Sequence, residues 1–597
     1  MRKVTLFFAL LLLTVMPAGA VFAQVDATQG APGMARYMPG DTDIFAAFRT
    51  DDAYIGELDG VYQRVLTALP EAARAEMPGS LIESIDTSMT NEGSYEEVRE
   101  WLGDYAALSL GNLVVTMDDD PGNDSEVEFL FLLEISNADA FKTYFEDIVM
   151  IDSDEFVKSE EADYTLYSDP AESAYLAVSD NLAILTNNPE MIAFEQAAPL
   201  VNDSSYQQSF TTLPESSYNI VFYLDYNALL GGIMTQPGQA DMFAAMGVDL
   251  QNIRSMVMGF TILDGRSFAM DIGVDADYDA LGVDLSAFSS IDPAFEKFIP
   301  ADTEVIIRAT DMSTNYITQT DQFSTMMQEM DPGSADPFEQ VEGTLAAFTG
   351  INLREDILSW TTGDYAIAMD VNFDAFVALL GGMETGNDPM AMLDPSPLGL
   401  ALLIEATDPA LAADATAKIV GAVERFTGGE ESISIAPDTV GGHDATIIGF
   451  TVPMEGQPFT LELVIGSNNE VFFFGTKDYI ESALTGGGLA EDAEYQDASQ
   501  YFLSDASTLI YTDDDGLLAS FAVPALVFVG PAIGNVFDSI AEDLNASAPD
   551  SSRMMVQNDP TAEAREALDA YRGLIASSSI TASYTNGTTI RLVITLE

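Results

Sequence analysis

The sequence contains no cysteine and a single histidine, His443. These absences exclude disulfide bonds, thiolate metal sites and cysteine nucleophiles, and they leave no second imidazole for a zinc cluster. Basic residues are also scarce: 21 lysines and arginines stand against 97 aspartates and glutamates, so the 597-residue chain has a formal charge of -76. Such a chain cannot neutralise the phosphates of a nucleic acid, which excludes that class of partner.

Motifs of catalysis and cofactor binding are missing too. No Walker A loop, dinucleotide-binding fingerprint or Gly-x-Ser-x-Gly elbow occurs, so we expect no cofactor and no serine nucleophile to complete a triad with His443 and Asp444. We interpret His443 as a loop residue with a local hydrogen bond. Yet 47% of the residues are hydrophobic and 10% are aromatic, far more than in a disordered acidic polymer. We therefore expect a folded chain with a large core beneath an acidic surface.

Residues 1–23 have the pattern of an export signal. Met1, Arg2 and Lys3 form a short basic segment, residues 4–15 are apolar, and small residues precede a predicted cleavage after Ala23, with the segment ending at residue 20 as an alternative. We expect a secreted or extracytoplasmic bacterial protein, in which residues 24–36 form a linker.

Two distinctive segments occur twice along the chain. A Pro-x-Asp-Thr sequence opens an apolar run at residues 39–42 and again at 300–303, and the only two tryptophans, Trp101 and Trp360, each precede Gly-Asp-Tyr-Ala. Further matching segments follow in the same order at growing offsets, which places insertions near 381–397 and 517–577. The repeat predicts two tandem copies, over residues 37–279 and 290–597.

Within a copy, the hydrophobic patterns predict both strands and helices. Ile590, Leu592, Ile594 and Leu596 alternate with Arg591, Val593 and Thr595, which is typical of a strand with one buried face. Turn sequences at 264–265 and 586–587 predict hairpins. Helical patterns cover residues 138–150, 189–197, 408–426 and 561–575. We therefore predict an α+β fold of two tandem copies, each a broad, mainly antiparallel sheet with helices packed on one face.

The export signal, the Pro-x-Asp-Thr openings and the repeated Trp followed by Gly-Asp-Tyr-Ala resemble an uncharacterised family of secreted bacterial proteins, catalogued only as a domain of unknown function. The resemblance covers most of the mature chain. It implies a two-copy extracytoplasmic protein, and it brings no catalytic residue or ligand that can be carried over.

Both motifs also have a structural explanation. In Gly-Asp-Tyr-Ala, the glycine suits the left-handed position that ends a helix, the aspartate forms a local turn, and Tyr-Ala begins the next strand. Trp101 and Trp360 are then expected in the core. The Pro-x-Asp-Thr opening is interpreted in the same way, as a turn before a strand.

Clusters of aspartates suggest a divalent cation, because Ca²⁺ prefers carboxylate oxygens. Asp118 and Asp120 lie in one cluster, and Asp513 and Asp515 lie in another. The spacing does not match an EF-hand loop, since Asn123 stands where glycine is required. We predict solvated acidic loops and keep these four aspartates as the calcium candidates.

Residues 517–537 carry no charge and are long enough to cross a bilayer. Pro524 and Pro531 would break a lone helix in lipid, and the repeat places strands of one copy before and after the segment. We therefore expect a helical insertion, not an integral membrane span, in the mature chain.

Together these features favour a non-enzymatic exported protein, with a binding or structural role at the bacterial envelope or exterior. Two alternatives stay open. The 26 methionines and 34 phenylalanines suit a carrier of a hydrophobic small molecule or lipid, and the many carboxylates leave room for a carboxylate-dependent hydrolase. Because the acidic excess causes self-repulsion that salt screens, we also predict a saline host or compartment.

Overall fold

The computed structural model describes residues 26–68, 74–75, 77–88, 94–111, 127–149, 156–169, 174–228, 252–281, 284–301, 303–330, 336–371, 398–427, 432–452, 459–513, 575–585 and 587–596. The chain divides into two compact units. Unit 1 comprises Met1–Ser286 and the C-terminal segment Ala582–Leu596, and unit 2 comprises Ala287–Thr581 with the final Glu597.

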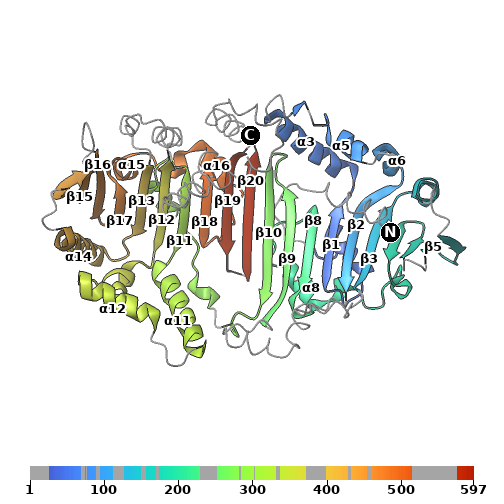
Figure 1. Cartoon of the computed structure of the whole chain (residues 1–597), viewed down its shortest axis with the longest axis horizontal. Coiled ribbons are helices and arrows are strands. Elements are labelled where there is room, and N and C mark those ends of the chain that lie inside the picture. The colour runs from blue at the N-terminus through green and yellow to red at the C-terminus, as the bar shows by residue number, and fades with distance from the viewer. Residues whose placement is uncertain are drawn as a thin grey trace, which may run out of the picture. The chain divides into compact units, whose positions relative to one another are not determined.

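Unit 1 is built on an antiparallel sheet with the strand order β20-β10-β9-β8-β1-β2-β3-β7-β6-β5-β4 (Figure 1). Its strands are β1 (Ile44–Arg49), β2 (Leu102–Gly111), β3 (Glu128–Ile135), β4 (Val157–Glu160), β5 (Thr165–Asp169), β6 (Ala174–Val178), β7 (Leu182–Thr186), β8 (Ile220–Asp225), β9 (Ile253–Ile262), β10 (Ser267–Ala276) and β20 (Thr588–Leu596). The C-terminal strand β20 therefore completes the sheet of the N-terminal unit by pairing with β10.

Unit 2 has an antiparallel sheet with the order β18-β11-β12-β13-β17-β16-β15-β14. Its strands are β11 (Val305–Thr310), β12 (Asp364–Val371), β13 (Leu398–Glu405), β14 (Ile433–Val440), β15 (His443–Val452), β16 (Phe459–Ser467), β17 (Val471–Thr476) and β18 (Thr508–Asp513). The strand β19 (Ile575–Ser583) begins in this unit.

Over the strands β1, β2, β3 and β7, both faces of the sheet in unit 1 are covered, and apolar side chains there occupy consecutive positions. In β3, Leu130 and Leu132 belong to one core cluster and Phe131 and Leu133 to the other. The first cluster lies beneath α2 (Gly30–Gly33), η1 (Met34–Tyr37), η4 (Leu200–Asn202) and α8 (Ser204–Phe210). The second lies beneath α3 (Asp52–Ala68), α5 (Leu81–Ser88), α6 (Tyr95–Arg99), α7 (Ala138–Tyr144) and the π-helix η2 (Phe145–Val149).

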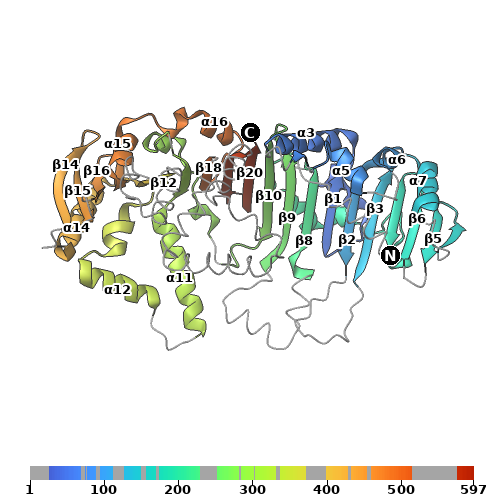
Figure 2. The ribbon, with the colours of Figure 1, turned by 45° about the horizontal axis from the view of Figure 1, so that its top comes forward.

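Unit 2 is likewise covered on both faces. One cluster packs beneath η7 (Pro293–Phe298), α15 (Lys477–Thr485), η11 (Leu489–Glu491) and α16 (Ala493–Ser499). The other packs beneath α11 (Met312–Met330), η8 (Leu353–Ile357), η9 (Leu358–Trp360) and α14 (Pro409–Thr427), and α14 lies on β16 and β17. The helix α12 (Pro337–Thr349) follows α11, and Figure 2 shows the two helices to one side of the strands of unit 2.

The structure supports an α+β fold with antiparallel sheets and corrects three details of the prediction. Helices lie on both faces of each sheet, not on one. The predicted linker 24–36 is also wrong in its described part, because α2 and η1 bury Ala31, Met34 and Ala35 in the core. Finally, the helical pattern at 189–197 yields only a short 3₁₀ turn, η3 (Pro189–Met191).

Other predicted elements are confirmed. The pattern at 408–426 forms α14, where the Asp408 carboxylate accepts hydrogen bonds from the N–H groups of Ala410 and Leu411. The turn at 264–265 joins β9 to β10, with Gly265 at φ 82°. His443, which was predicted to be a loop residue, is instead the first residue of β15, where it pairs with Val440 across a turn of two glycines with positive φ.

Several predictions fall outside the described residues: the export signal 1–23, both insertions almost entirely, most of the helical pattern 561–575, and the apolar segment 517–537. Among the residues that the structure does describe, no helix is both long enough and apolar enough to cross a membrane.

Candidate functional site

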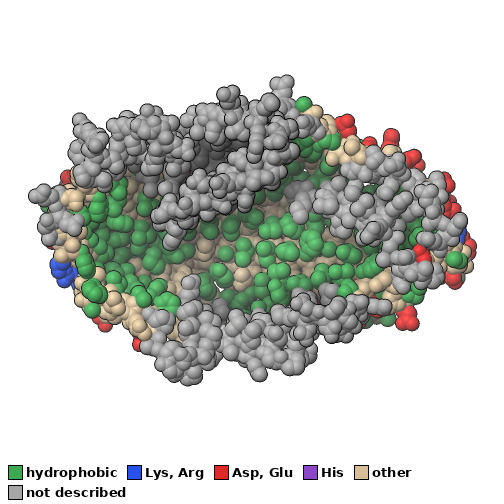
Figure 3. Space-filling model, in the orientation of Figure 1, with side chains coloured by type: hydrophobic (Ala, Val, Ile, Leu, Met, Phe, Trp, Pro, Cys, Tyr) green, Lys and Arg blue, Asp and Glu red, His purple; other side chains and the backbone are tan. Residues whose placement is uncertain are grey.

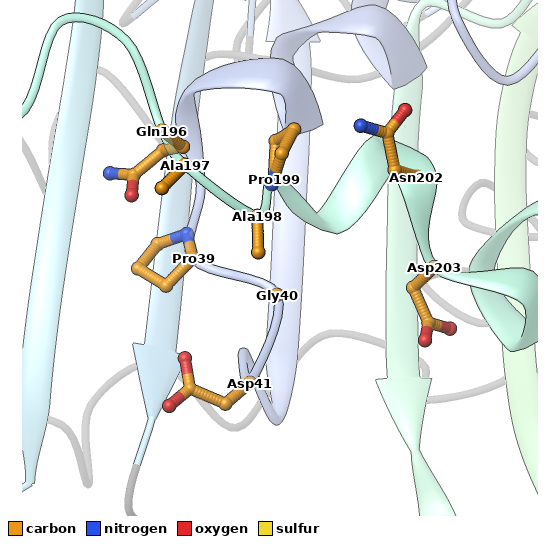
Figure 4. A pocket seen from close by; sticks show the side chains of 9 residues that line it. All are labelled: Pro39, Gly40, Asp41, Gln196, Ala197, Ala198, Pro199, Asn202 and Asp203. Atoms are coloured by element: carbon orange, nitrogen blue, oxygen red, sulfur yellow. The ribbon is translucent and has the colours of Figure 1, made fainter.

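The Pro-x-Asp-Thr opening of unit 1 forms one wall of a shallow hollow (Figure 4). The Thr42 hydroxyl donates to the Pro39 carbonyl at 2.7 Å and closes the turn. The turn approaches residues 196–199 so closely that a Cβ on Gly40 would lie 2.8 Å from the Ala198 carbonyl oxygen. Asp203, also in the lining, is already occupied in capping α8.

The same turn occurs in unit 2, where the Thr303 hydroxyl donates to the Pro300 carbonyl at 2.7 Å. In both units the motif pairs with the segment ahead of a 3₁₀ helix, through Leu200 N–H to Met38 in unit 1 and Leu489 N–H to Ile299 in unit 2. Its role as a turn before a strand is confirmed.

Gly-Asp-Tyr-Ala has a different structural basis from the one predicted. Neither Gly103 nor Gly363 has a positive φ, so neither ends a helix in the left-handed conformation. Each glycine instead makes room for an acidic residue on the next strand: a Cβ would lie 2.7 Å from the Glu134 carbonyl carbon or 2.2 Å from Glu405 Oε2.

Both tryptophans lie in the core, as predicted, with 1% of each side chain exposed. Trp101 packs edge-on against Phe141, and Trp360 packs against Phe472. The Trp360 indole N–H donates to the Asp356 carbonyl at 2.9 Å. These contacts leave neither ring available to a ligand.

Of the four calcium candidates, Asp513 is the one that lies in the described part of the chain, where no three acidic or histidine side chains converge on a possible cation site. Asp513 is the last residue of β18, and its N–H donates to the Glu304 carbonyl at 3.1 Å. Asp118, Asp120 and Asp515 lie outside the described residues.

A buried ionic network joins β20 to β10 inside unit 1. Arg591 donates from Nε to Asp271 Oδ1 at 2.7 Å and also bonds Glu215, and these three side chains are at most 1% exposed. The Tyr218 hydroxyl donates to Asp271 Oδ2 at 2.7 Å, and burial together with the Asp271 charge raises the pKa of Tyr218 well above its usual value. The network is sealed from solvent, which makes it structural.

Unit 2 contains a comparable network around Arg308, whose side chain is fully buried. Arg308 donates to Glu296 at 2.9 Å and to Asp364 at 2.8 Å, and the Tyr495 hydroxyl donates to the same Glu296 oxygen. Burial raises the pKa of Asp364, although Arg308 opposes the shift.

The strands β9, β10 and β20 of unit 1 carry polar and small side chains on a buried face and large apolar side chains on a partly exposed one. In β10, Ser267, Asp271 and Asp275 are buried, whereas Met270 and Ile272 are partly exposed. We call the partly exposed side the open apolar face; it consists of Phe222, Leu224, Met256, Met258, Phe260, Phe268, Met270, Ile272, Val274, Ile590, Leu592 and Ile594.

Register aligns these side chains in rows across the strands. One row runs from Phe222 through Met258 and Ile272 to Ile590, each residue paired with the next. The neighbouring row joins Phe260, Met270 and Leu592 in the same way. Figure 3 shows hydrophobic side chains gathered over β8, β9 and β10, and both ribbon views place α3 toward one end of these strands (Figures 1 and 2).

Glycines explain why the polar side is the covered one. A Cβ on Gly259 would lie 2.4 Å from the Tyr218 ring, and one on Gly273 would lie 1.7 Å from the Thr212 hydroxyl. The segment that carries these residues follows α8, which packs on β9 and β10. Because both glycines lack side chains, this segment rests directly on the strands and seals the Arg591 network.

Unit 2 has a smaller set of partly exposed apolar residues on one side of its sheet. Ile307 pairs with Ile367 and with Ile510, and Ile367 pairs with Leu402. Met369 pairs with Leu400.

A family model described as "Protein of unknown function (DUF3352)" matches residues 5–554. The chain belongs to this family. The predicted resemblance to an uncharacterised family is thereby confirmed. Neither a curated protein nor a solved structure matches.

In this DUF3352 chain, the open apolar face was missed by the sequence analysis, although its signal was present. The alternation in β20 predicted one buried face without identifying it. The structure buries Arg591, Val593 and Thr595 and leaves Ile590, Leu592 and Ile594 partly exposed. Small and polar residues at alternate positions of β9 and β10 were the clue.

Proposed function

We propose that this chain is a non-enzymatic exported protein of the bacterial envelope or exterior that binds a hydrophobic small molecule or lipid on the open apolar face of unit 1. The observation that carries the proposal is the row of apolar side chains from Phe222 to Ile590, all partly exposed. A large exposed apolar patch is costly in water, and such patches usually mark a binding surface.

The composition of the face suits a ligand without fixed shape. Methionines alternate with isoleucine and phenylalanine along the rows, and flexible thioether side chains adapt to different apolar partners. Phe222 and Phe260 pack edge to face beside these methionines, with 6.0 Å between their ring centroids, and add two rigid aromatic rings to the face.

The proposal includes export and a tandem duplication. Export is supported by the sequence of residues 1–23. Duplication is supported by the strand orders: β8-β1-β2-β3-β7-β6-β5-β4 in unit 1 corresponds strand by strand to β18-β11-β12-β13-β17-β16-β15-β14 in unit 2. Two Pro-x-Asp-Thr turns with the same hydrogen bond add to this support.

A carboxylate-dependent hydrolase is less well supported. Paired carboxylates that act on a substrate must reach it. The two described pairs that converge in the core, Glu215 with Asp271 and Glu296 with Asp364, are each bound to a buried arginine.

Titration with N-phenyl-1-naphthylamine, an uncharged dye that fluoresces in apolar sites, tests the proposal. We expect saturable binding of the dye to the mature chain. In Met258→Asp we expect the affinity for the dye to fall at least tenfold, because the new carboxylate lies in the middle of the row from Phe222 to Ile590. Met258→Gln keeps the size of the side chain and should give a smaller loss in the same direction.

The matched control is Val341→Asp, which places the same charge on α12 in unit 2, where Val341 is 63% exposed. This variant should bind the dye as the wild type does. Equal affinity in the wild type and in Met258→Asp, with both folded by circular dichroism, would refute the proposed site.

A further inference from the structure

We infer that the ligand of the open apolar face is an amphiphile whose polar end carries a positive charge. This inference rests on the proposed function and adds the chemical class of the ligand. It follows from the charges around the face, on β8, β9, β10 and β20.

Every basic side chain on these four strands and on the turn between β9 and β10 is already matched by carboxylates. Arg254 contacts Asp275 at 2.8 Å and Asp277 at 3.9 Å. Arg266 contacts Asp264 at 3.4 Å, and Arg591 is buried in the network described above. Each of these guanidinium groups already contacts a carboxylate, so none of them is left to hold an anionic headgroup.

The acidic side chains of the same region outnumber the basic ones. The three arginines stand against four aspartates on these strands and their turn, Asp225, Asp264, Asp271 and Asp275, with Asp277 directly after β10 and Glu215 in the buried network. Asp264 and Asp277 are exposed. They lie at opposite ends of β10, Asp264 in the turn before Ser267 and Asp277 just after Ala276. Asp264 contacts Arg266 at 3.4 Å, whereas Asp277 and Asp275 share Arg254, so net negative charge is left at the Asp277 end, where an amphiphile lying along the strand meets it.

The formal charge of -76 acts in the same direction over a longer range. An anionic amphiphile is repelled by the local carboxylates and by the whole chain, whereas a cationic one is attracted by both. The apolar rows themselves carry no charge, so the hydrocarbon tail of the amphiphile gains binding free energy from burial alone. The charge of its headgroup then decides which of several amphiphiles binds best.

The test is displacement of N-phenyl-1-naphthylamine by three amphiphiles with the same twelve-carbon chain: dodecylammonium, dodecanol and dodecanoate. At low ionic strength, where the Debye length is about 30 Å, we expect dodecylammonium to displace the dye at concentrations at least about tenfold lower than dodecanoate, with dodecanol between them. At about 1 M salt, where the Debye length falls to about 3 Å, the difference should shrink to about twofold or less.

The double variant Asp264→Asn/Asp277→Asn separates the local effect from the general one. Asparagine keeps the acceptor oxygen that Asp264 offers to Arg266 and Ser267 and that Asp277 offers to Ala280. We expect this variant to lose at least half of the cation preference. The matched control, Asp163→Asn/Asp180→Asn, removes two exposed carboxylates from the turns of β4–β5 and β6–β7 and should keep the preference.

The outcomes are distinguishable. If the dye does not bind at all, the proposed function fails and the inference fails with it. If the dye binds and the three amphiphiles displace it equally, the apolar site stands and the charge preference is refuted. An equal loss of preference in both double variants would also overturn the assignment to Asp264 and Asp277.

Discussion

Arg591 and Asp271 are 320 positions apart in sequence, yet Arg591 donates from Nε to Asp271 Oδ1 at 2.7 Å and from Nη2 to Asp271 Oδ2 at 2.8 Å. The two residues are opposite each other in the β10–β20 pair, and both side chains are buried. This bidentate pair is the point at which the C-terminal strand is held in the sheet of unit 1.

Arg591→Met should destabilise the protein strongly. The substitution leaves Asp271 and Glu215 buried without their cation, and such a loss costs about 3–5 kcal/mol. Chemical denaturation followed by circular dichroism measures the change. The control is Arg99→Met, which breaks an ion pair with Asp52 that is exposed on both sides and should cost about 1 kcal/mol or less. Equal costs in the two variants would contradict the role given to the buried network.

Removal of residues 582–597 should destabilise unit 1 more than unit 2. The two tryptophans serve as separate reporters, because Trp101 lies in unit 1 and Trp360 in unit 2. In a Trp360→Phe background, truncation should lower the denaturation midpoint that Trp101 fluorescence reports. In a Trp101→Phe background, the midpoint reported by Trp360 should move less. The opposite order would show that β20 does not stabilise unit 1.

Glu134→Gln should stabilise the protein at neutral pH and have no effect in acid. Burial raises the pKa of Glu134 above its usual value of 4.5; Arg36 opposes this rise and Asp104 adds to it. The folded state therefore binds this proton more readily than the unfolded chain, so the contribution to stability is present below pH 4.5 and is lost as the pH rises through the folded pKa.

The measurement is the difference in unfolding free energy between Glu134→Gln and the wild type across this pH range. The exposed Glu195→Gln removes the same charge and corrects for the relief of general repulsion. A difference that equals that of the control at every pH would rule out the buried carboxylate as its cause.

Thermal stability should rise with salt. The chain carries a formal charge of -76, and counterions at about 1 M shorten the Debye length to about 3 Å and so reduce self-repulsion. Melting temperatures from dilute buffer to molar sodium chloride measure the effect. A midpoint that stays constant or falls would contradict the predicted adaptation to a saline setting.

The sequence revealed those features that depend on local pattern. The helical pattern at 408–426 predicted α14, the turn sequence at 264–265 predicted a hairpin, and the two tryptophans were expected in the core. Each of these depends on residues that are close in sequence or on a simple preference for burial.

What the sequence did not reveal depends on pairing over long distances. Arg591 can be buried because Glu215 and Asp271 pair with it, and the sequence around Arg591 does not predict these distant partners. The covering of the polar side of β10 requires Thr212 to rest on Gly273. Without knowledge of these contacts, the alternation in β20 does not show which of its two faces is covered, so the open apolar face cannot be recognised from the sequence.

Native mass spectrometry of the chain purified from its own host shows whether the open apolar face holds a ligand. We expect wild-type protein to carry additional mass from a co-purified amphiphile, and Met258→Asp, purified in the same way and folded, to have lost it. A wild-type protein that shows only the mass of the polypeptide, indistinguishable in occupancy from Met258→Asp, would contradict the claim that the open apolar face is a ligand site.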